Sequence, residues 1–308
     1  MDREPVIDRL PKAAFVAVVG RPSVGKSTLV NLLCGGKVAI VSPVPQTTRN
    51  AIRGIINRPR GQLVFVDTPG MHVSEKKLNQ RLLNVANRSV EESELVLYVL
   101  DASRSPGAEE DAVAGRLSSP ACTERTLAVI NKMDAPEADF QRIRNFLDQK
   151  LPLLSPSRCF QVSALKNEGV DAVVECLFDI APPGEPFYPE EYYTDQDVSF
   201  RVAEIIREKA INRLRQELPH SIYVEVADME LTDGGKRLWV RAFILTERES
   251  QKGMVVGKGG EVIKAIGQEA RKDLNRIFDW KVELDLRVKT AKDWRHNDHL
   301  LRRLIDRP

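Results

Sequence analysis

The sequence predicts an α/β domain, with a mostly parallel sheet and helices on both faces, followed by a smaller α+β domain. A chain of 308 residues is too long for one ordinary domain and suits two. In its first part, short apolar runs rich in β-branched residues alternate with longer amphipathic runs. Beyond residue 200 the order of the expected elements changes, which indicates a second module.

Strands of the first domain are expected where apolar runs are short and continuous, because strands of a parallel sheet are buried on both faces. Amphipathic patterns predict helices at Lys77–Ser93 and Phe140–Leu151. Alternation of strands and helices favours a parallel sheet that is covered on both sides. The expected strands are Phe15–Val19, Leu63–Asp67, Leu95–Asp101, Thr126–Asn131 and Cys159–Ser163.

A domain boundary is predicted at Ala181–Pro186, because its prolines and glycine cannot continue a helix. The acidic segment from there to Asp197 is interpreted as a loosely packed linker. A helix with one apolar face follows and is expected to end at Leu218-Pro219. The residues on that face are Val202, Ile206, Ala210 and Leu214.

The rest of the second domain is predicted as two strands, a glycine loop that opens a helix, and a third strand. The helix is expected to run from this loop to about Phe278. The resulting order, helix–strand–strand–helix–strand, is that of a compact α+β module. The predicted segments are the alternating Ile222, Val224 and Val226, the strand Leu238–Thr246, the turn Thr232–Gly235, the loop Gly257–Gly260 and the alternating Val282, Leu284, Leu286 and Val288.

Composition excludes several classes of protein. Four scattered cysteines, without a CxxC pair or a histidine at ligand spacing, indicate reduced thiols rather than a disulfide or zinc framework. The sequence starts without the basic and apolar regions of a signal peptide, and its apolar runs are too short to span a bilayer, so we expect a cytoplasmic protein. Residues 201–308 carry 23 Lys and Arg against 18 Asp and Glu, which permits a polyanionic partner.

The segment Gly20–Ser27 matches the pattern GxxxxGK[ST] between a predicted strand and a predicted helix, which is the context that a phosphate-binding loop requires. Its glycines allow several backbone N–H groups to face a pyrophosphate, and the helix N-terminus adds partial positive charge. We expect Lys26 to reach the β- and γ-phosphates and the Ser27 hydroxyl to bind Mg²⁺. The alternative, a glycine-rich loop that only caps a helix, does not account for this context.

A second motif, Asp67-Thr68-Pro69-Gly70, ends the strand Leu63–Asp67. Asp67 is expected to hold Mg²⁺ through water, and the Gly70 N–H is expected to meet the γ-phosphate and so to respond to its hydrolysis. By itself the motif is only a strand that ends in a turn, but its position after a phosphate loop favours a switch.

Asn131-Lys132-Met133-Asp134 predicts the base. The Asp134 carboxylate can accept from guanine N1–H and N2–H₂, a donor pair that adenine lacks. We expect the Lys132 stem to cover the ring, Asn131 to tie this loop to the phosphate loop, and the Ala164 N–H to meet guanine O6. The predicted guanine-nucleotide residues are Gly20, Arg21, Pro22, Ser23, Val24, Gly25, Lys26, Ser27, Thr28, Asp67, Thr68, Pro69, Gly70, Met71, Asn131, Lys132, Asp134, Ser163, Ala164 and Leu165.

These motifs resemble those of the translation-factor-related GTPases, and Pro45–Arg49 resembles the first switch of their Era branch. The resemblance implies that one threonine, Thr48 in preference to Thr47, closes over Mg²⁺ and the γ-phosphate when GTP is bound. Lys26, Thr48 and Gly70 are then the expected catalytic residues, and Ser27, Thr48 and Asp67 the expected Mg²⁺ ligands. The switch comprises Gln46, Thr47, Thr48 and Arg49.

The hydrolytic step is the least defined part of this resemblance. Met71 stands where Ras-like proteins have a glutamine that orients water, and a thioether cannot do this, so slow intrinsic turnover is expected. Ser23 stands where family members often carry an asparagine associated with potassium, which leaves potassium dependence open. Arg21 and Arg49 are candidate charge stabilisers, although solvated surface arginines are the preferred interpretation.

The loop Gly257-Lys258-Gly259-Gly260 resembles the GXXG loop of a prokaryotic-type KH domain, which clamps about four nucleotides of single-stranded nucleic acid. Lys258 supplies charge, and Met254 and Val255 are expected to pack on bases. A glycine turn before a helix is common, but the order of elements around this one favours a KH domain.

A GTPase domain joined to such a KH domain resembles the Era family of bacterial ribosome-assembly GTPases over about residues 14–290. The resemblance implies GTP and GDP as ligands, a monomer, binding to 16S ribosomal RNA near its 3′ end and to the 30S subunit or its precursors, and it allows peripheral association with the cell membrane. The implied domains are a P-loop GTPase domain at 14–182, a linker at 183–199, a KH domain at 200–290 and a tail at 291–308, with a short helix at Trp294–Leu304.

Two other classes of function are alternatives to a GTPase switch on ribosomal RNA. A P-loop nucleotide kinase or ATPase predicts neither the Asn131–Asp134 motif nor the glycine loop at Gly257, so the sequence argues against it. An RNA-binding chaperone that only senses GTP stays open because of Met71.

Overall fold

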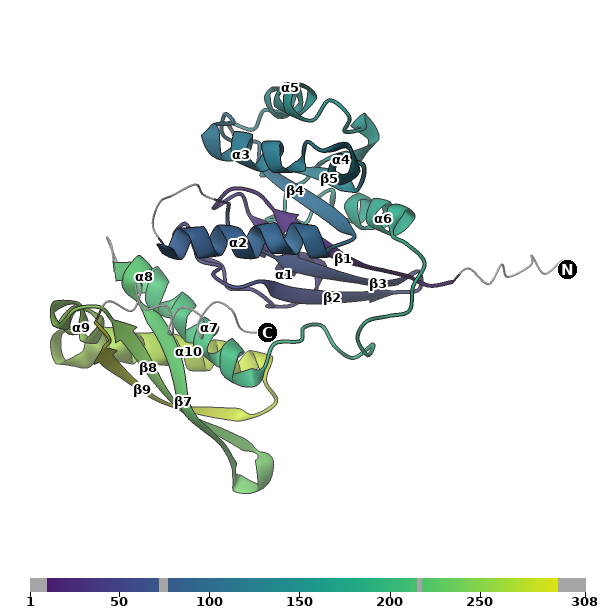
Figure 1. Cartoon of the computed structure of the whole chain (residues 1–308). Helices are drawn as coiled ribbons and strands as arrows, with labels where there is room; N and C mark the ends of the chain where they lie inside the picture. Colours follow the sequence, from purple (N-terminus) through teal and green to yellow (C-terminus); the bar gives the residue numbers. More distant parts are fainter. Residues whose placement is uncertain (1–9, 72–76, 215–217, 293–308) are drawn as a thin grey trace, which may run out of the picture. The chain divides into compact units, whose positions relative to one another are not determined.

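The computed structural model describes residues 10–71, 77–214 and 218–292, which fall into two compact units (Figure 1). The first unit comprises residues 10–38, 51–71 and 83–195, and the second comprises residues 39–50, 77–82 and 196–292 without 215–217. The expected helix at Trp294–Leu304 lies outside the described residues.

A six-stranded sheet of order β2-β3-β1-β4-β5-β6 forms the first unit. All neighbouring strands are parallel except β2, which is antiparallel to β3. The strands are β1 (Lys12–Val19), β2 (Ile52–Arg58), β3 (Gly61–Asp67), β4 (Leu95–Asp101), β5 (Thr126–Asn131) and β6 (Cys159–Gln161). The helices are α1 (Lys26–Leu33), α2 (Lys77–Glu92, with residues 77–82 grouped in the second unit), α3 (Ala108–Leu117), α4 (Pro120–Glu124), α5 (Phe140–Lys150) and α6 (Val170–Ile180), with a short 3₁₀ turn at Pro156–Arg158.

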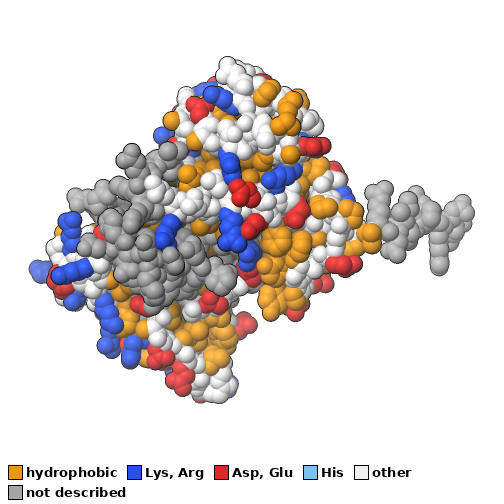
Figure 2. Space-filling view, viewed as in Figure 1, with side chains coloured by type: hydrophobic (Ala, Val, Ile, Leu, Met, Phe, Trp, Pro, Cys, Tyr) orange, Lys and Arg blue, Asp and Glu red, His pale blue; other side chains and the backbone are white. Residues whose placement is uncertain are grey.

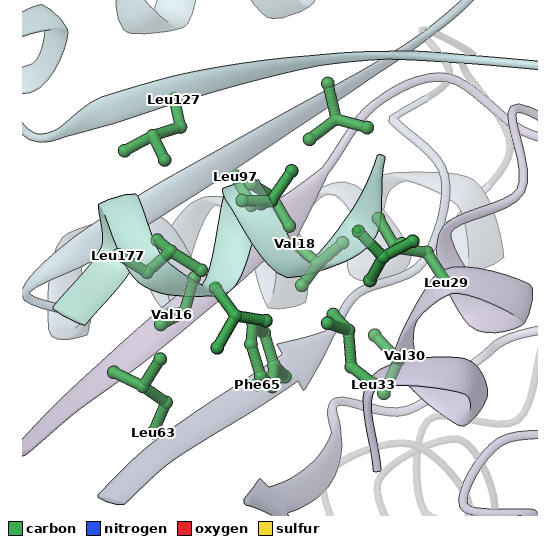
Figure 3. Close-up of a cluster of buried hydrophobic side chains, with 14 of the residues drawn as sticks. Val16, Val18, Leu29, Val30, Leu33, Leu63, Phe65, Leu97, Leu127 and Leu177 are labelled. Carbon is green, nitrogen blue, oxygen red and sulfur yellow. The ribbon is translucent and has the colours of Figure 1, made fainter. Parts of the chain in front are cut away.

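Between their end residues, the central strands β1, β4 and β5 are continuous apolar runs, because both faces of the sheet are covered. Successive side chains of a strand point to opposite faces, so Val16 and Val18 of β1 enter one core while Ala17 and Val19 enter the other. Figure 3 shows the first core, where α1 and α6 add Leu29, Leu33 and Leu177 to side chains from the sheet. Helices α2, α3 and α5 cover the opposite face. The predicted parallel sheet with helices on both faces is confirmed.

The segment that follows α6 is held firmly against β2 and β3. Gln62, which is fully buried in β3, accepts from the N–H groups of Phe187 and Tyr188 at 2.8 and 3.0 Å. The Ile55 N–H of edge strand β2 donates to Tyr193 O at 2.9 Å, so the segment satisfies part of an otherwise open sheet edge. The expected loose packing of this segment is therefore wrong.

The second unit has a three-stranded sheet of order β7-β8-β9, in which β7 is antiparallel and β9 parallel to β8. Alternate residues of these strands meet α7 and α10 in one core. The elements are α7 (Val198–Arg213), α8 (Leu218–Ser221), β7 (Tyr223–Thr232), β8 (Arg237–Thr246), α9 (Glu249–Val256), α10 (Glu261–Ile277) and β9 (Lys281–Thr290), with 3₁₀ turns at Asp233–Gly235 and Lys258–Gly260.

The predicted α+β module is confirmed with two corrections. Helix α7 ends at Arg213 rather than at Leu218-Pro219, and Pro219 lies inside the short helix α8. Proline is tolerated there because the first residues of a helix need no N–H donor. Helix α9 was not predicted, because its sequence lacks a clear apolar face and contains Gly253.

Candidate nucleotide site and glycine loop

The phosphate loop follows β1 at the carboxyl end of the sheet and leads into α1. Gly25 has a φ of 98°, and a Cβ there would lie 2.4 Å from Asn131 Nδ2, so both its conformation and its neighbour require glycine. Lys26 is buried, and its Nζ donates to Gly20 O at 3.0 Å and Arg21 O at 2.9 Å. Burial, opposed by the nearby Asp67, lowers the pKa of Lys26 to about 8. This cation lies among backbone groups at a helix N-terminus, an arrangement suited to phosphate.

Ser27 and Asp67 meet because β1 and β3 are parallel neighbours whose carboxyl ends lie together. The Ser27 hydroxyl donates to Asp67 Oδ2 at 2.6 Å. A hydroxyl and a carboxylate are hard oxygen ligands of the kind Mg²⁺ prefers, with phosphate and water completing its shell. The residues present therefore fit this ion. In the described part of the chain, no three His, Cys, Asp or Glu side chains gather into a further metal-binding group.

The motif that begins at Asp67 packs on the phosphate loop. Thr68 Oγ1 donates to Val18 O at 2.7 Å, and the Met71 N–H donates to Gly20 O at 3.2 Å. A Cβ on Gly70 would lie 2.6 Å from Pro22 N, so only glycine allows this approach. The Met71 side chain is buried in the core that α2, α3 and α5 cover, which leaves backbone groups at this corner of the site.

The predicted tie between Asn131 and the phosphate loop is confirmed. Asn131 Nδ2 donates to Val24 O at 2.8 Å, and its Oδ1 accepts from the Ala164 N–H at 3.0 Å. One amide thus joins three loops. The predicted bond from the Ala164 N–H to guanine O6 stays a prediction, and it requires this N–H to be shared between two acceptors.

The half-buried Asp134 is oriented by a hydroxyl. Ser163 Oγ donates to Asp134 Oδ1 at 2.6 Å and accepts from the Lys166 N–H at 3.1 Å. The Ser163 hydrogen bond holds the pKa of Asp134 below its ordinary value, so at neutral pH the carboxylate is a pure acceptor. Leu165 beside it is exposed.

Lys132 connects the loop Asn131–Asp134, here called the base loop, to the phosphate loop. Its backbone is left-handed, with a φ of 63°, and its Nζ donates to Ser23 O and to Asp101 Oδ2, both at 2.8 Å. Asp101 ends β4 and was not among the predicted site residues, although a carboxylate at the carboxyl end of a central parallel strand is a usable signal.

Arg21 is buried rather than solvated. Its Nη2 lies 3.1 Å from Asp101 Oδ2, and its Nε pairs with Glu110 of α3. The expectation of a surface arginine is therefore wrong. Because two carboxylates neutralise the guanidinium, Arg21 is a structural part of the site.

The switch segment, residues 39–50, belongs to the second unit. The Val41 N–H donates to Glu208 Oε1 at 2.9 Å, and Arg207 Nη2 donates to Thr47 O at 2.6 Å. Thr47 and Thr48 are buried. Thr48 belongs to the same unit as α7, whereas Ser27 and Asp67 belong to the first unit.

Arg49 and Gln46 complete the description of this segment. Arg49 is buried and donates to Ile222 O at 2.9 Å, so its expected surface position is wrong. Gln46 has a φ of 61°, a conformation that few residues other than glycine adopt. The contribution of α7 could not be read from the switch sequence, because these contacts join residues about 160 positions apart.

The glycine loop of the second unit lies between α9 and α10. Gly257, Gly259 and Gly260 have φ values of 75°, 62° and 81°. A Cβ on Gly257 would lie 2.5 Å from Val262 Cγ2, whereas one on Gly259 or Gly260 would meet open space. Lys258 is exposed, and in Figure 2 Lys and Arg side chains lie along the edge of the second unit that carries α9.

The two apolar residues expected at bases have opposite surroundings. Met254 is 58% exposed, as a residue that packs on a ligand should be, but Val255 is fully buried in the core of the second unit. The expectation that Val255 packs on bases is therefore wrong, because successive residues of a helix point in different directions.

None of the described helices is both long enough and apolar enough to cross a bilayer.

Family models match both parts of the chain. A model described as a 50S ribosome-binding GTPase matches residues 15–132, and a model of the KH domain matches residues 217–295. GTPase Era of Treponema denticola is 47% identical over 292 residues, which cover 95% of this chain and 99% of the relative. GTPase Era of Borreliella afzelii is 43% identical and covers 96% of this chain and 100% of its own.

Two solved structures resemble the whole chain. A point variant of Aquifex aeolicus Era bound to GDP.AlF4⁻ has a TM-score of 0.89 and 33% identity, covering 95% of this chain and 98% of its own. A structure of Era in complex with MgGDPNP and nucleotides 1506–1542 of 16S ribosomal RNA has a TM-score of 0.88 and 34% identity. The match covers 96% of this chain and 98% of that one.

Proposed function

This chain belongs to the GTPase Era family, and on that premise we propose that it is a GTP-hydrolysing switch that acts on the 3′ end of 16S ribosomal RNA. The observation that carries the nucleotide half of the proposal is the Asn131 amide, which joins the phosphate loop to the Ala164 loop. We propose the nucleotide domain at 14–182, the linker at 183–199 and the RNA-binding domain at 200–290.

The nucleotide residues have distinct proposed roles. Lys26 and the backbone of Gly20–Ser27 hold the phosphates, and Asp134 selects guanine. Ser27 and Asp67 would hold Mg²⁺, joined by Thr48 when GTP is bound. The ion would neutralise charge that develops on the β- and γ-phosphates. The Gly70 N–H would then respond to the γ-phosphate. We propose that all the guanine-nucleotide residues predicted from the sequence belong to this site.

Slow hydrolysis is expected from the residue that follows Gly70, which is Met71. The Met71 side chain is buried, so it offers no polar group to the attacking water. The attacking water must therefore be oriented by backbone groups, by Thr48 or by a partner. This favours a switch in which a partner sets the lifetime of the GTP-bound state.

Replacing Lys26 with alanine should lower the single-turnover rate of GTP hydrolysis by on the order of 10²-fold or more, because the site loses its buried cation at the phosphates. The measurement is release of labelled phosphate from a protein–GTP complex, with Lys150→Ala on the surface of α5 as the control. A wild-type rate no higher than that of Lys26→Ala would leave only the GTP-sensing chaperone.

We propose that Gly257–Gly260 and the exposed Met254 bind single-stranded RNA that corresponds to nucleotides 1506–1542 of 16S ribosomal RNA. Three of the four loop residues are glycines with positive φ values, so they present no side chain where the sugar-phosphate chain must approach, and Lys258 supplies charge. The RNA would be met on the 30S subunit or a precursor of it. A cytoplasmic monomer fits this role, and peripheral membrane association would be a second location, testable by flotation with vesicles.

Adjacent residues of α9 should separate RNA binding from stability. Met254→Ala should weaken RNA binding by about 10-fold, the loss of one apolar contact with a base, with an unchanged melting temperature. Val255→Ala should instead destabilise the protein by about 2 kcal/mol, because two buried methyl groups are lost, with little effect on RNA affinity. Fluorescence anisotropy with RNA and thermal unfolding measure the two effects. Equal effects of both variants on RNA affinity would contradict the assignment.

A further inference from the structure

The strongest feature that the proposed function does not explain is the pairing of four charged side chains beside the nucleotide loops. They are Arg21, Asp101, Glu110 and Lys132. All four belong to the first unit, and the side chain of Asp101 is only 1% exposed. A buried carboxylate is costly unless it is fully paired, so its partners indicate what it does.

Both oxygens of Asp101 are used. Oδ2 accepts from Lys132 Nζ at 2.8 Å and Arg21 Nη2 at 3.1 Å, and Oδ1 accepts from the Ser103 N–H at 3.0 Å and its hydroxyl at 2.6 Å. Although burial acts to raise it, the pKa of Asp101 lies below its ordinary value because Lys132 and Ser103 donate to the carboxylate. The group is therefore an anion that contacts two cations through one oxygen.

Those two cations come from the two loops of the nucleotide site. Arg21 lies in the phosphate loop, and its Nη1 also donates to Pro22 O at 3.2 Å. Lys132 lies in the base loop, in a left-handed conformation, and its Nζ also donates to Ser23 O. Asp101 thus contacts the side chain of Lys132 and the phosphate loop at the same time.

Glu110 completes the charge balance. It pairs with Arg21 through Nε, whereas Asp101 pairs with Nη2, and its Oε2 accepts from the Gly107 N–H at 2.9 Å at the start of α3. Two anions therefore face two cations, which lowers the cost of placing them together.

We propose that Asp101 is a positioning residue for guanine-nucleotide binding, which sets the distance between the phosphate loop and the Lys132 stem. This inference rests on the proposed nucleotide site. Asp101 acts through Lys132 and Arg21 and contacts no part of the nucleotide itself.

The test compares Asp101→Asn with Ser103→Ala, which removes a partner of Asp101 without touching either cation. Asp101→Asn should raise the Kd for GDP by about 10- to 100-fold, the loss expected of a buried charge-assisted contact, whereas Ser103→Ala should change it by less than about threefold. The hydrolysis rate at saturating GTP should stay within about threefold of wild type, because Ser27, Asp67 and Gly70 keep their contacts. Circular dichroism shows whether each variant is folded at the assay temperature.

A double-mutant cycle with Lys132→Met distinguishes positioning from a general loss of structure. The methionine keeps a long stem but removes the ammonium group, so Asp101→Asn should weaken GDP binding much less in that background. If the two changes raise the Kd for GDP by factors that simply multiply, the inference is wrong. It is also wrong if Asp101→Asn lowers the hydrolysis rate at saturating GTP as much as it weakens GDP binding. In either case, GDP binding by the wild type would leave the proposed function standing. Absence of GDP binding by the wild type would overturn both.

Discussion

Replacing Asp134 with asparagine should exchange the preference of the site from guanine to xanthine nucleotides. Affinity for GTP should fall by roughly 10³- to 10⁴-fold, because a carboxylate that accepts from N1–H and N2–H₂ is replaced by an amide. The amide can donate to the O2 carbonyl that xanthine carries in place of the N2 amine, so affinity for XTP should rise. Competition of GTP and XTP for a fluorescent nucleotide measures both changes.

A matched control is available in the same unit. Asp139 caps α5 by accepting from the Arg142 N–H at 2.9 Å, and asparagine caps helices about as well as aspartate. Asp139→Asn should therefore leave nucleotide preference unchanged. Retention of GTP preference by Asp134→Asn would show that another residue selects the base.

The Ser163 hydroxyl gives a graded version of the same experiment. It donates to Asp134 Oδ1 at 2.6 Å and so orients the carboxylate. Removing it in Ser163→Ala should weaken GTP binding by about 10-fold without creating affinity for XTP, because the acceptor remains but is less well held.

The phosphate loop and the motifs that begin at Asp67 and Asn131 could be predicted from the sequence because each lies at the end of a largely buried strand. Strands β4 and β5 were predicted with their observed bounds, since unbroken apolar runs define them. Parallel strands bring their carboxyl ends to one edge of the sheet, so Asn131 and the phosphate loop were expected at the same edge. Strand β2 was missed because Arg53, Gly54 and Asn57 interrupt its apolar residues.

Contacts between distant segments could not be predicted in this way. The pairing of Asp101 with Arg21 and Lys132 depends on the order of β1, β4 and β5 in the sheet, which no local pattern specifies. Arg21 and Arg49 were misassigned for the same reason, because a charged residue is normally exposed unless a partner is known. The burial of Val255 follows from the rotation of α9, which leaves its neighbour Met254 exposed. That Met254 packs on bases stays a prediction.

A single aspartate in the glycine loop should separate RNA binding from nucleotide binding. Gly259→Asp should lower affinity for the 16S-derived RNA by about 100-fold, because a carboxylate would face phosphates at close approach. Gly259 is preferable to Gly257, where a Cβ would lie 2.5 Å from Val262 Cγ2 and strain the loop. At Gly259 the space is open, and aspartate tolerates left-handed backbone better than most residues. Gly257→Asp combined with Gly260→Asp should abolish specific binding.

The turn between β7 and β8 supplies the control for this change. Gly234 has a φ of 62°, as Gly259 does, and a Cβ there also meets open space. Gly234→Asp therefore adds the same charge in the same conformation to the same unit, outside the loop. It should leave RNA affinity within about twofold of wild type, while neither variant changes GTP affinity, since both lie outside the nucleotide loops. Equal loss of RNA affinity in the two variants would mean that the unit's net charge, and not a clamp at Gly257–Gly260, holds the RNA.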